Sequence, residues 1–252
     1  MLKIENLTVS VDSKKILDDF SLNINDGEIH VIMGPNGTGK STLSKVILGS
    51  EDYKVLYGDI IFNGKSIKNL TTDERAKLGI FLSMQNPTSI DGISNSEFIK
   101  SAINERRTSP IGLYEFIKKV EEVSKDLSID KEFVHRNVNV GASGGERKKN
   151  EIFQLRMLEP NFIILDELDS GLDIDSLKIV CKNINDYLEK NPKTSVLMIT
   201  HYPRILDYIK PNYVHVMING KIVKTGDYNL ALDIEKNGYT ELNKVSEFNK
   251  DE

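Results

Sequence analysis

Alternating apolar and polar residues identify the beginning of the chain as β structure. Residues 2–11 and 21–25 both follow this two-residue period, which is typical of strands with one buried face, and we expect the two to pair antiparallel. Asn63-Gly64 and Asn219-Gly220 each stand between strand-like flanks, where an Asn-Gly pair indicates a tight hairpin. The pattern therefore predicts an antiparallel β region and two hairpins.

A second group of strands is apolar almost without interruption. Residues 28–33, 162–165 and 195–199 form such runs, as expected of parallel strands that are covered on both faces. Residues 96–138 carry apolar side chains at three- and four-residue spacing, and residues 175–188 form a further amphipathic helix. Because strands alternate with helices, we expect an α/β fold with a parallel core and a helical insert.

Composition and charge narrow the class of protein. Of 252 residues, 39% are hydrophobic and 28% charged, as in an ordinary globular protein. The net charge of −5 gives no overall field that would attract nucleic acid, and no apolar run approaches the roughly 18 residues of a membrane span. The single cysteine, Cys181, falls on the apolar face of the 175–188 helix and fits a reducing compartment. We expect a cytoplasmic protein, or one of the plastid stroma after removal of a transit peptide, without nucleic acid or membrane insertion.

The residues directly after the 28–33 strand predict a phosphate-binding loop. They read GPNGTGKS, match the pattern G-x-x-x-x-G-K-[ST] and lead into a helical segment. In such a loop the glycines let backbone N–H groups face phosphate oxygens, Lys40 reaches the β- and γ-phosphates, and Ser41 holds magnesium. The residues expected to contact a nucleotide are Gly34, Asn36, Gly37, Thr38, Gly39, Lys40, Ser41 and Thr42.

Two carboxylates follow the buried strand at 162–165. Asp166 and Glu167 project at the C-terminal end of this strand, which is the end where open α/β sheets bind ligands. Asp166 can hold magnesium, and Glu167 can orient or deprotonate an attacking water. Taken alone, the pair is explained equally well as an acidic strand end without function, and the phosphate loop upstream favours the functional interpretation.

One shorter pattern and two histidines have competing interpretations. Ser143-Gly144-Gly145 opens the helix expected at 147–158, as either a simple cap or an anion-binding end. His201 follows the 195–199 strand, where a lone histidine usually packs or caps, but the other motifs favour a role in the site. His30 is expected to be a packed strand residue and not a ligand.

Together these residues resemble the ABC (ATP-binding cassette) ATPase family from residue 2 to about residue 240. The resemblance implies ATP and Mg²⁺ as cofactors, and a transient ATP-dependent homodimer in which Ser143 and Gly145 contact the γ-phosphate of ATP bound by the second copy. It also implies that Gln85 contributes to magnesium binding and to coupling. The implied residues are Glu167, His201, Lys40 and Gln85 for catalysis, Ser41, Gln85 and Asp166 for the metal, and Ser143, Gly144, Gly145 and Asp173 for the nucleotide.

The same resemblance implies an architecture. We expect α/β structure with a P-loop NTPase core of ABC type, an antiparallel β subdomain and a helical subdomain, all within one domain over residues 1–252. The core with its β subdomain would take residues 1–84 and 155–252, and the helical subdomain, with the 143–146 signature, about 85–154.

Longer runs are similar to the SufC branch of that family, whose members are soluble and serve the SUF iron–sulfur cluster assembly machine. This similarity implies SufB-like and SufD-like scaffold proteins as partners, docked near residues 85–94 and the adjoining helical segment, and the alternative for residues 85–94 is a solvated loop without a partner. The alternative is a soluble nucleotide-binding subunit of an ABC membrane transporter, which would share every catalytic motif. The runs are 32–44, 49–53, 137–141, 143–150, 166–173 and 200–211.

Three places depart from the family pattern. Ala142 and Glu146 stand where many members have Leu and Gln, and Gly171 stands where Ala is usual. No aromatic residue lies near Val11, where a side chain that stacks on adenine is usual. Because the residues that contact phosphate are intact, we expect an active ATPase.

Overall fold

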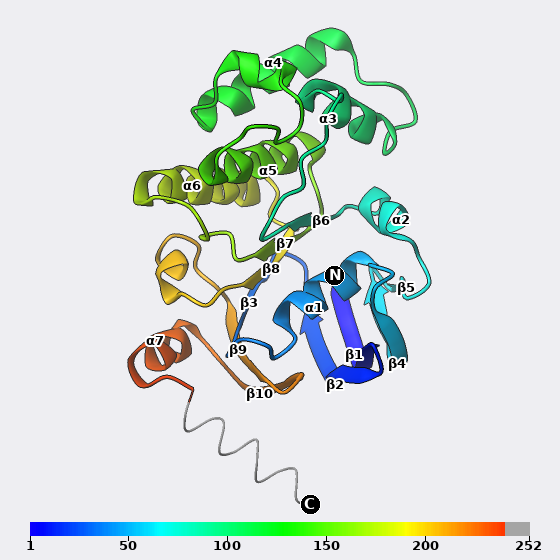
Figure 1. The fold of residues 1–252 in the computed structure, drawn as a ribbon, viewed down its shortest axis with the longest axis vertical. Coiled ribbons are helices and arrows are strands. Elements are labelled where there is room, and N and C mark those ends of the chain that lie inside the picture. Colours follow the sequence, from blue (N-terminus) through cyan, green and yellow to red (C-terminus); the bar gives the residue numbers. More distant parts are fainter. Residues whose placement is uncertain (240–252) are drawn as a thin grey trace, which may run out of the picture.

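The structure, a computed structural model, describes residues 1–239. The first part of the chain forms an antiparallel sheet (Figure 1). Leu2 pairs with Ile24 and Ile4 with Leu22, which confirms the predicted antiparallel pairing. The second strand begins at Lys14, earlier than the alternation predicted. The strands are β1 (Leu2–Val11), β2 (Lys14–Ile24), β4 (Lys54–Phe62) and β5 (Lys65–Ser66), in the order β2-β1-β4-β5.

A larger, mainly parallel sheet occupies the centre of the molecule. Five of its strands run parallel, and β10 joins β9 antiparallel at one edge. The three apolar runs of the sequence form the adjacent strands β3, β8 and β7, as the pattern predicted. The strands are β3 (Ile29–Met33), β6 (Ile80–Ser83), β7 (Phe162–Asp166), β8 (Ser195–Ile199), β9 (Tyr213–Ile218) and β10 (Lys221–Gly226), in the order β10-β9-β3-β8-β7-β6.

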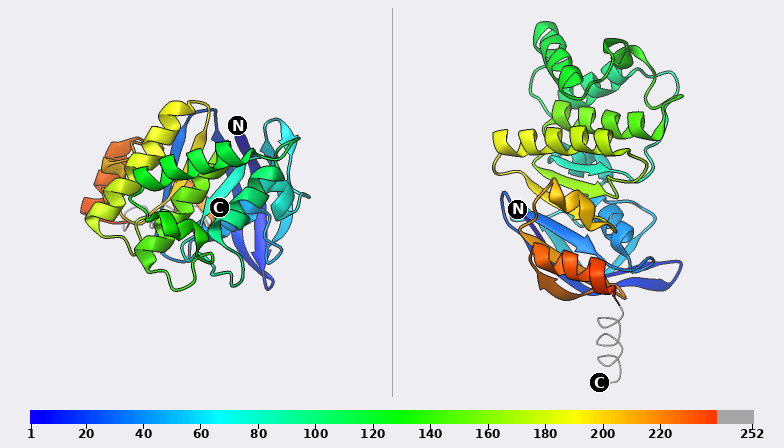
Figure 2. Two further views of the ribbon diagram at one scale, coloured as in Figure 1. Left: turned by 90° about the horizontal axis from the view of Figure 1, so that it is seen from above. Right: turned by 90° about the vertical axis from the view of Figure 1, so that its left-hand side faces the viewer.

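The helices gather mainly at one end of the molecule. Figure 2 shows α3, α4 and α5 stacked beyond the central sheet, with α7 at the opposite end. The helical region lies between β6 and β7, and α5 runs through the predicted boundary at residues 154 and 155. The helices are α1 (Lys40–Leu48), α2 (Thr72–Lys77), α3 (Asn95–Asn104), α4 (Leu113–Asp126), α5 (Gly144–Leu158), α6 (Ile174–Lys190) and α7 (Tyr228–Asn237), with short 3-10 helices η1 (Lys131–His135) and η2 (Pro203–Asp207).

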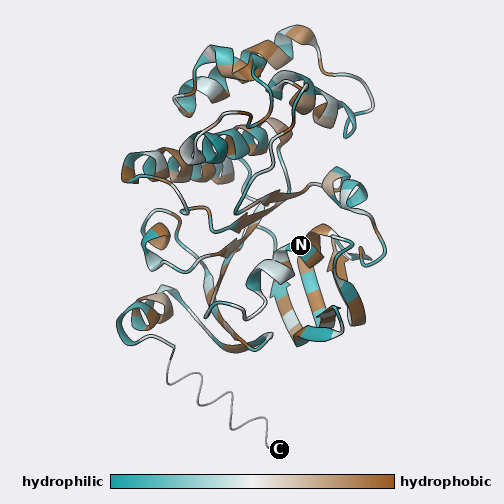
Figure 3. Cartoon of the chain, viewed as in Figure 1, coloured by the Kyte–Doolittle hydropathy of each residue, from teal (hydrophilic) through white to brown (hydrophobic). Residues whose placement is uncertain are grey.

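Two hydrophobic cores lie on the two faces of the central sheet. Val31 and Met33 of β3 face a core shared with α5 and α6, whereas Ile32 faces the core shared with α1 and the antiparallel sheet. Since successive strand residues point to opposite faces, a strand covered on both faces is expected to be apolar at most positions, as β3 is apart from His30. Figure 3 accordingly shows the central strands as hydrophobic along their length.

Both predicted hairpins are present. Asn63 and Gly64 have φ values of 50° and 78°, and Asn219 and Gly220 have 50° and 77°, as a tight turn with two left-handed residues requires. Gly220 also donates its backbone N–H to the carbonyl of Thr38 at 3.1 Å. The second hairpin therefore supports the phosphate loop.

A buried arginine closes the C-terminal end of α1. Arg75 of α2 is 3% exposed, and its Nη1 donates to the carbonyls of Val46 and Ile47 at 2.8 and 2.9 Å. Its Nε and Nη2 donate to two further carbonyls, those of Leu70 and Lys68. One side chain thus satisfies four backbone acceptors, two of which belong to the last turn of the helix that follows the phosphate loop.

We expect Arg75→Met to lower the free energy of unfolding by at least about 3 kcal/mol, because it strips hydrogen bonds from several buried carbonyls at once. Urea titration would measure this loss. Arg107→Met is the control, since the Arg107–Glu115 ion pair is exposed and should contribute less than about 1 kcal/mol. Equal stability of the two variants would show that Arg75 has no special structural role.

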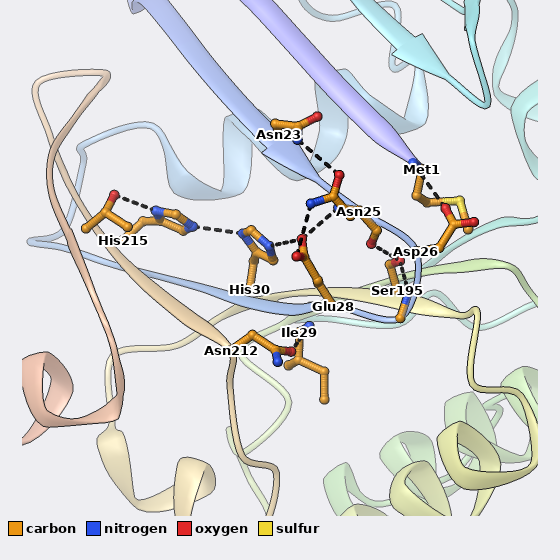
Figure 4. A network of polar contacts seen from close by, with 12 residues as sticks. Met1, Asn23, Asn25, Asp26, Glu28, Ile29, His30, Ser195, Asn212 and His215 are labelled. Carbon is orange, nitrogen blue, oxygen red and sulfur yellow. Dashed lines mark hydrogen bonds and ion pairs between the residues drawn. The ribbon is translucent and has the colours of Figure 1, made fainter.

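A line of polar contacts joins the start of β3 to β9 and β10 (Figure 4). His30 Nε2 lies 3.0 Å from Glu28 Oε2, His30 Nδ1 lies 2.9 Å from His215 Nε2, and His215 Nδ1 lies 2.8 Å from the Thr225 hydroxyl. An ionised carboxylate only accepts, so each histidine donates from Nε2 and accepts at Nδ1. His30 is 3% exposed and contributes to packing, as predicted.

This network makes stability depend on pH. Burial lowers the pKa of His215 to about 4 and lowers that of His30 as well, with Glu28 opposing the shift at His30. As pH falls from about 6.5, the unfolded chain therefore binds more protons than the folded chain. Protonation of His215 in the unfolded chain alone should lower the free energy of unfolding by about 2 kcal/mol by pH 5. We expect His215→Gln to reduce the difference between unfolding free energies measured at about pH 7 and pH 5. If the two unfolding free energies differ as much in His215→Gln as in the unsubstituted chain, His215 is not a source of the pH dependence.

Candidate active site

The phosphate loop lies between β3 and α1. Gly37 and Gly39 have φ values of 78° and 100°, which residues with side chains rarely adopt. A Cβ on Gly34 would lie 2.1 Å from the carbonyl oxygen of Met217, so only glycine allows the loop to pass this close to β9. No side chain caps the N-terminus of α1, whose first N–H groups are therefore available to an anion.

Lys40 is held inside this loop by the loop's own backbone. Its Nζ donates to the carbonyl oxygens of Gly34 at 2.8 Å and Pro35 at 2.7 Å, and the residue is 5% exposed. Burial lowers the pKa of Lys40, while the carboxylates of Glu167 and Asp166 oppose that shift. The ammonium group is thus placed at a fixed point between the loop and the two acidic residues.

Three predicted residues meet at the ends of adjacent strands. Glu167 follows β7 directly, and its Oε2 accepts a hydrogen bond from Gln85 Nε2 at 2.5 Å, just beyond β6. Its Oε1 lies 3.2 Å from Nε2 of His201, which follows β8. Glu167 itself has φ 49°, a left-handed conformation that a β7 residue could not adopt. The parallel order β8-β7-β6 therefore brings His201, Glu167 and Gln85 together.

Asp166 suits a divalent cation. It is 5% exposed, and its Oδ1 has no hydrogen-bond partner among residues 1–239. Burial and the nearby Glu167 carboxylate raise the pKa of Asp166, while the neighbouring Ser44 and Ser41 hydroxyls and the Lys148 ammonium group oppose this shift. A buried, unpartnered carboxylate oxygen beside a serine hydroxyl matches the oxygen ligands that Mg²⁺ prefers. Bound Mg²⁺ would neutralise charge on phosphate oxygens.

These groups surround one cleft of about 840 Å³, a size common for ligand sites. Nine predicted residues line its wall, namely Asn36, Gly37, Gly39, Lys40, Ser41, Thr42, Gln85, Glu167 and His201. Gly34 and Thr38 belong to the loop without lining the cleft, and Asp166 is buried behind Glu167.

The predicted signature residues lie elsewhere. Ser143, Gly144, Gly145 and Asp173 do not line the cleft. Ser143 is exposed at the start of α5, where its Oγ accepts from Glu146 N at 3.3 Å and its N–H donates to Glu146 Oε2 at 2.8 Å. Glu146, one of the departures from the family pattern, thus completes a capping box. Asp173 caps α6 by accepting from Ser176 N.

Four residues of the cleft were not among the predicted site residues. Ile16 of β2 lines it beside Gly39, and Asp169, Ser170 and Tyr202 line it near Glu167 and His201. Burial raises the pKa of Asp169. The sequence offered a partial signal for Asp169, Ser170 and Tyr202, because they follow the same strands, β7 and β8, as the predicted Glu167 and His201. Ile16 had no signal of its own, since only the fold brings β2 to the loop.

Comparisons with known proteins identify the family of this chain. The family model described as ABC transporter matches residues 17–170, which is more than half of the chain. A probable ATP-dependent transporter, ycf16, of Trieres chinensis is 48% identical, covering 95% of this chain and 96% of that protein. Vegetative protein 296 of Bacillus subtilis (strain 168) is 50% identical, covering 94% and 91%.

Solved structures show the same fold. The crystal structure of a nucleotide-free ATP-binding cassette from an ABC transporter is 26% identical and has a TM-score of 0.73, covering 92% of this chain and 95% of that one. The predicted α/β fold of ABC type is confirmed. Within residues 1–239, no helix has the length and apolarity needed to cross a membrane. The chain belongs to the ABC transporter family, as an ATPase that binds ATP with Mg²⁺ and hydrolyses it.

Proposed function

We propose that this chain is the ATPase subunit of a SUF-type iron–sulfur cluster assembly complex, in which ATP bound between two copies closes them and reshapes a SufB-like and SufD-like scaffold. The observation that carries the dimer in this proposal is the division of the predicted site. The cleft of one chain contains the phosphate loop, Gln85, Glu167 and His201, whereas Ser143 is exposed outside it. A second copy would complete the site with its own Ser143.

The contacts around Glu167 support a hydrolytic role. Gln85 and His201 each hold one of its carboxylate oxygens, so the carboxylate has a fixed orientation above the phosphate loop. In that position Glu167 would align a water with the γ-phosphate and take its proton. Lys40 would pair with the phosphate oxygens, and Ser41 and Asp166 would hold Mg²⁺.

Dimer closure follows from differential affinity. ATP drives two copies together only insofar as it binds the closed pair more tightly than the open chains. The exposed end of α5 at Ser143, with the N–H groups of Gly144 and Gly145, offers an anion-binding surface for this purpose. Hydrolysis would remove the γ-phosphate that both copies share and allow the pair to open.

Three observations bear on the partner, two favouring a scaffold and one a membrane transporter. The motif runs that are similar to the SufC branch support the scaffold, for example residues 143–150 and 200–211. Apolar side chains are also exposed beside Gln85, with Met84 at 42% and Ile93 at 41%, where we expect the scaffold to dock. The second candidate is the nucleotide-binding subunit of a membrane transporter, which the name of the Trieres chinensis relative favours.

Purification of the native complex through a tag on this chain tests the partner. We expect scaffold proteins of the SUF type to co-purify, and a photo-cross-linker placed at Ile93 to capture a scaffold subunit. Recovery of membrane permeases without scaffold proteins would reject the proposal and favour the transporter subunit. An active complex in which the Ile93 probe captures no subunit would remove the docking surface from the proposal.

A further inference from the structure

The segment after β6, residues 84–94, carries Gln85 and is here called the Gln loop. Most of its residues are exposed, yet both of its ends are fastened to α5 by buried polar groups. Figure 1 shows the chain passing beside α5 between β6 and α3. Burying polar groups costs free energy unless they are paired, so a buried cluster in which almost every group is paired, with Asn150 Oδ1 as an exception, calls for an explanation.

At the first end, two side chains of α5 hold the backbone of Met84 from both sides. Glu151 Oε1 accepts from Met84 N at 2.7 Å, and Lys148 Nζ donates to the carbonyl oxygen of Met84. Lys148 Nζ also lies 3.0 Å from Glu151 Oε2, which accepts from the Ser83 hydroxyl at 2.9 Å. Lys148 is 2% exposed and Glu151 is 5% exposed. The residue immediately before Gln85 is therefore held at both its N–H and its C=O.

At the second end, an asparagine of the same helix holds the far side of the loop. Asn150 Nδ2 donates to the side-chain oxygens of Asn139 at 2.8 Å and of Asn95 at 2.9 Å. Asn139 Nδ2 donates in turn to the carbonyl of Thr88 at 2.9 Å, and its own carbonyl accepts from the Ser89 hydroxyl at 3.0 Å. The loop is thus connected to α5 at both ends.

We propose that Lys148 and Glu151 form a positioning clamp that keeps Gln85 against Glu167 and makes the Gln loop and α5 move as one body. Helix α5 begins immediately after Ser143, so the same body carries the residue expected to reach the second copy's ATP. A partner that displaces the loop therefore moves Gln85 and Ser143 together. The proposal rests on the role of Gln85 in hydrolysis proposed above, and it is independent of which partner binds.

The clamp can be removed without leaving an unpaired charge. Replacing a buried ion pair by apolar residues of similar size is often neutral or stabilising, whereas removing one partner is costly. The test variant is therefore Lys148→Met combined with Glu151→Met. Its matched control is Lys182→Met with Asp186→Met, which removes the ion pair of α6 between the exposed Lys182 and the partly exposed Asp186. ATPase activity of the purified full chain is measured for both.

We expect the clamp variant to lose at least about tenfold in kcat while its KM for ATP changes less than about threefold, because the phosphate loop is untouched. The control should match the unsubstituted chain. A second variant, Met84→Pro, leaves Lys148 and Glu151 in place but removes the N–H that donates to Glu151 and fixes the local φ, and Met84→Leu is its control at the same exposed position. Met84→Pro should show the same loss of kcat, and Met84→Leu none.

A signal independent of activity comes from fluorescence. The chain contains no tryptophan, so Asn86→Trp places a single tryptophan in the Gln loop, whose emission can be excited selectively over that of the nine tyrosines. We expect its anisotropy to fall when the clamp substitutions are added and to remain unchanged with the control pair. Folded clamp variants with kcat within about twofold of the unsubstituted chain and unchanged anisotropy would overturn the clamp.

Gln85→Ala separates failure of the clamp from failure of the site assignment. If Gln85→Ala loses kcat while the clamp variants keep it, Lys148 and Glu151 are not positioning residues. If Gln85→Ala keeps full kcat, the proposed role of Gln85 fails, and the clamp proposal falls with it.

Discussion

Replacing Glu167 by Gln should lower the rate of phosphate release by about 100-fold or more, while ATP still binds. The amide keeps the shape of the side chain and its reach to Gln85 and His201, but it cannot take a proton from water. Because the phosphate loop is unaltered, equilibrium binding of Mg-ATP should remain close to that of the unsubstituted chain.

The same variant should accumulate dimers. If hydrolysis reopens the closed pair, a chain that binds ATP without hydrolysing it remains closed, and sedimentation in Mg-ATP should show a dimer that Mg-ADP does not produce. Glu189→Gln on α6 is a control outside the cleft and should behave as the unsubstituted chain. A Glu167→Gln chain that stays monomeric and fully active would contradict the assigned role.

The second large effect is expected at Lys40. Lys40→Ala removes the one lysine of the cleft wall, whose Nζ is fixed by the carbonyls of Gly34 and Pro35. Charge-assisted hydrogen bonds contribute about 1.5–3 kcal/mol each, so ATP affinity should fall by roughly 10- to 100-fold. Titration calorimetry would measure this change.

Lys45→Ala provides the matched control for Lys40→Ala. Lys45 lies in the last turn of the same helix and is exposed, so its removal changes the net charge equally without touching the cleft. ATP affinity should be unchanged in this variant. An equal loss of affinity in both variants would indicate a general charge effect and would remove Lys40 from its assigned position.

The fold could be predicted for segments whose hydrophobic pattern directly reflects their burial in the folded protein. The apolar runs identified β3, β7 and β8, because strands covered on both faces are apolar at most positions. The start of β2 was missed. Its Asp19 has φ 54° and the register with β1 shifts nearby, which interrupts the two-residue period that the prediction depended on. Strand β6 is only four residues long, too short for a period to be evident.

The site could be predicted only for residues that must stand at fixed positions next to a particular strand or helix. The phosphate loop needs glycines at fixed positions before a helix, and the acidic pair needs a strand end, so both were readable in the sequence. The Lys148–Glu151–Met84 contacts join residues 64 and 67 positions apart and depend on how α5 packs beside β6. No spacing rule reports such contacts, and only the structure shows them.

The absence of Ser143 from its own chain's cleft is the observation on which the account depends most. Disulfide trapping tests it directly, because the native thiol of Cys181 is fully buried and burial raises its pKa to about 12. Two chains are mixed, both with Glu167→Gln, one with Asn36→Cys in the phosphate loop and the other with Ser143→Cys. We expect a disulfide between the two chains to form in Mg-ATP and not in Mg-ADP. If the mixture binds ATP and yet no ATP-dependent disulfide forms, the two copies do not complete each other's sites.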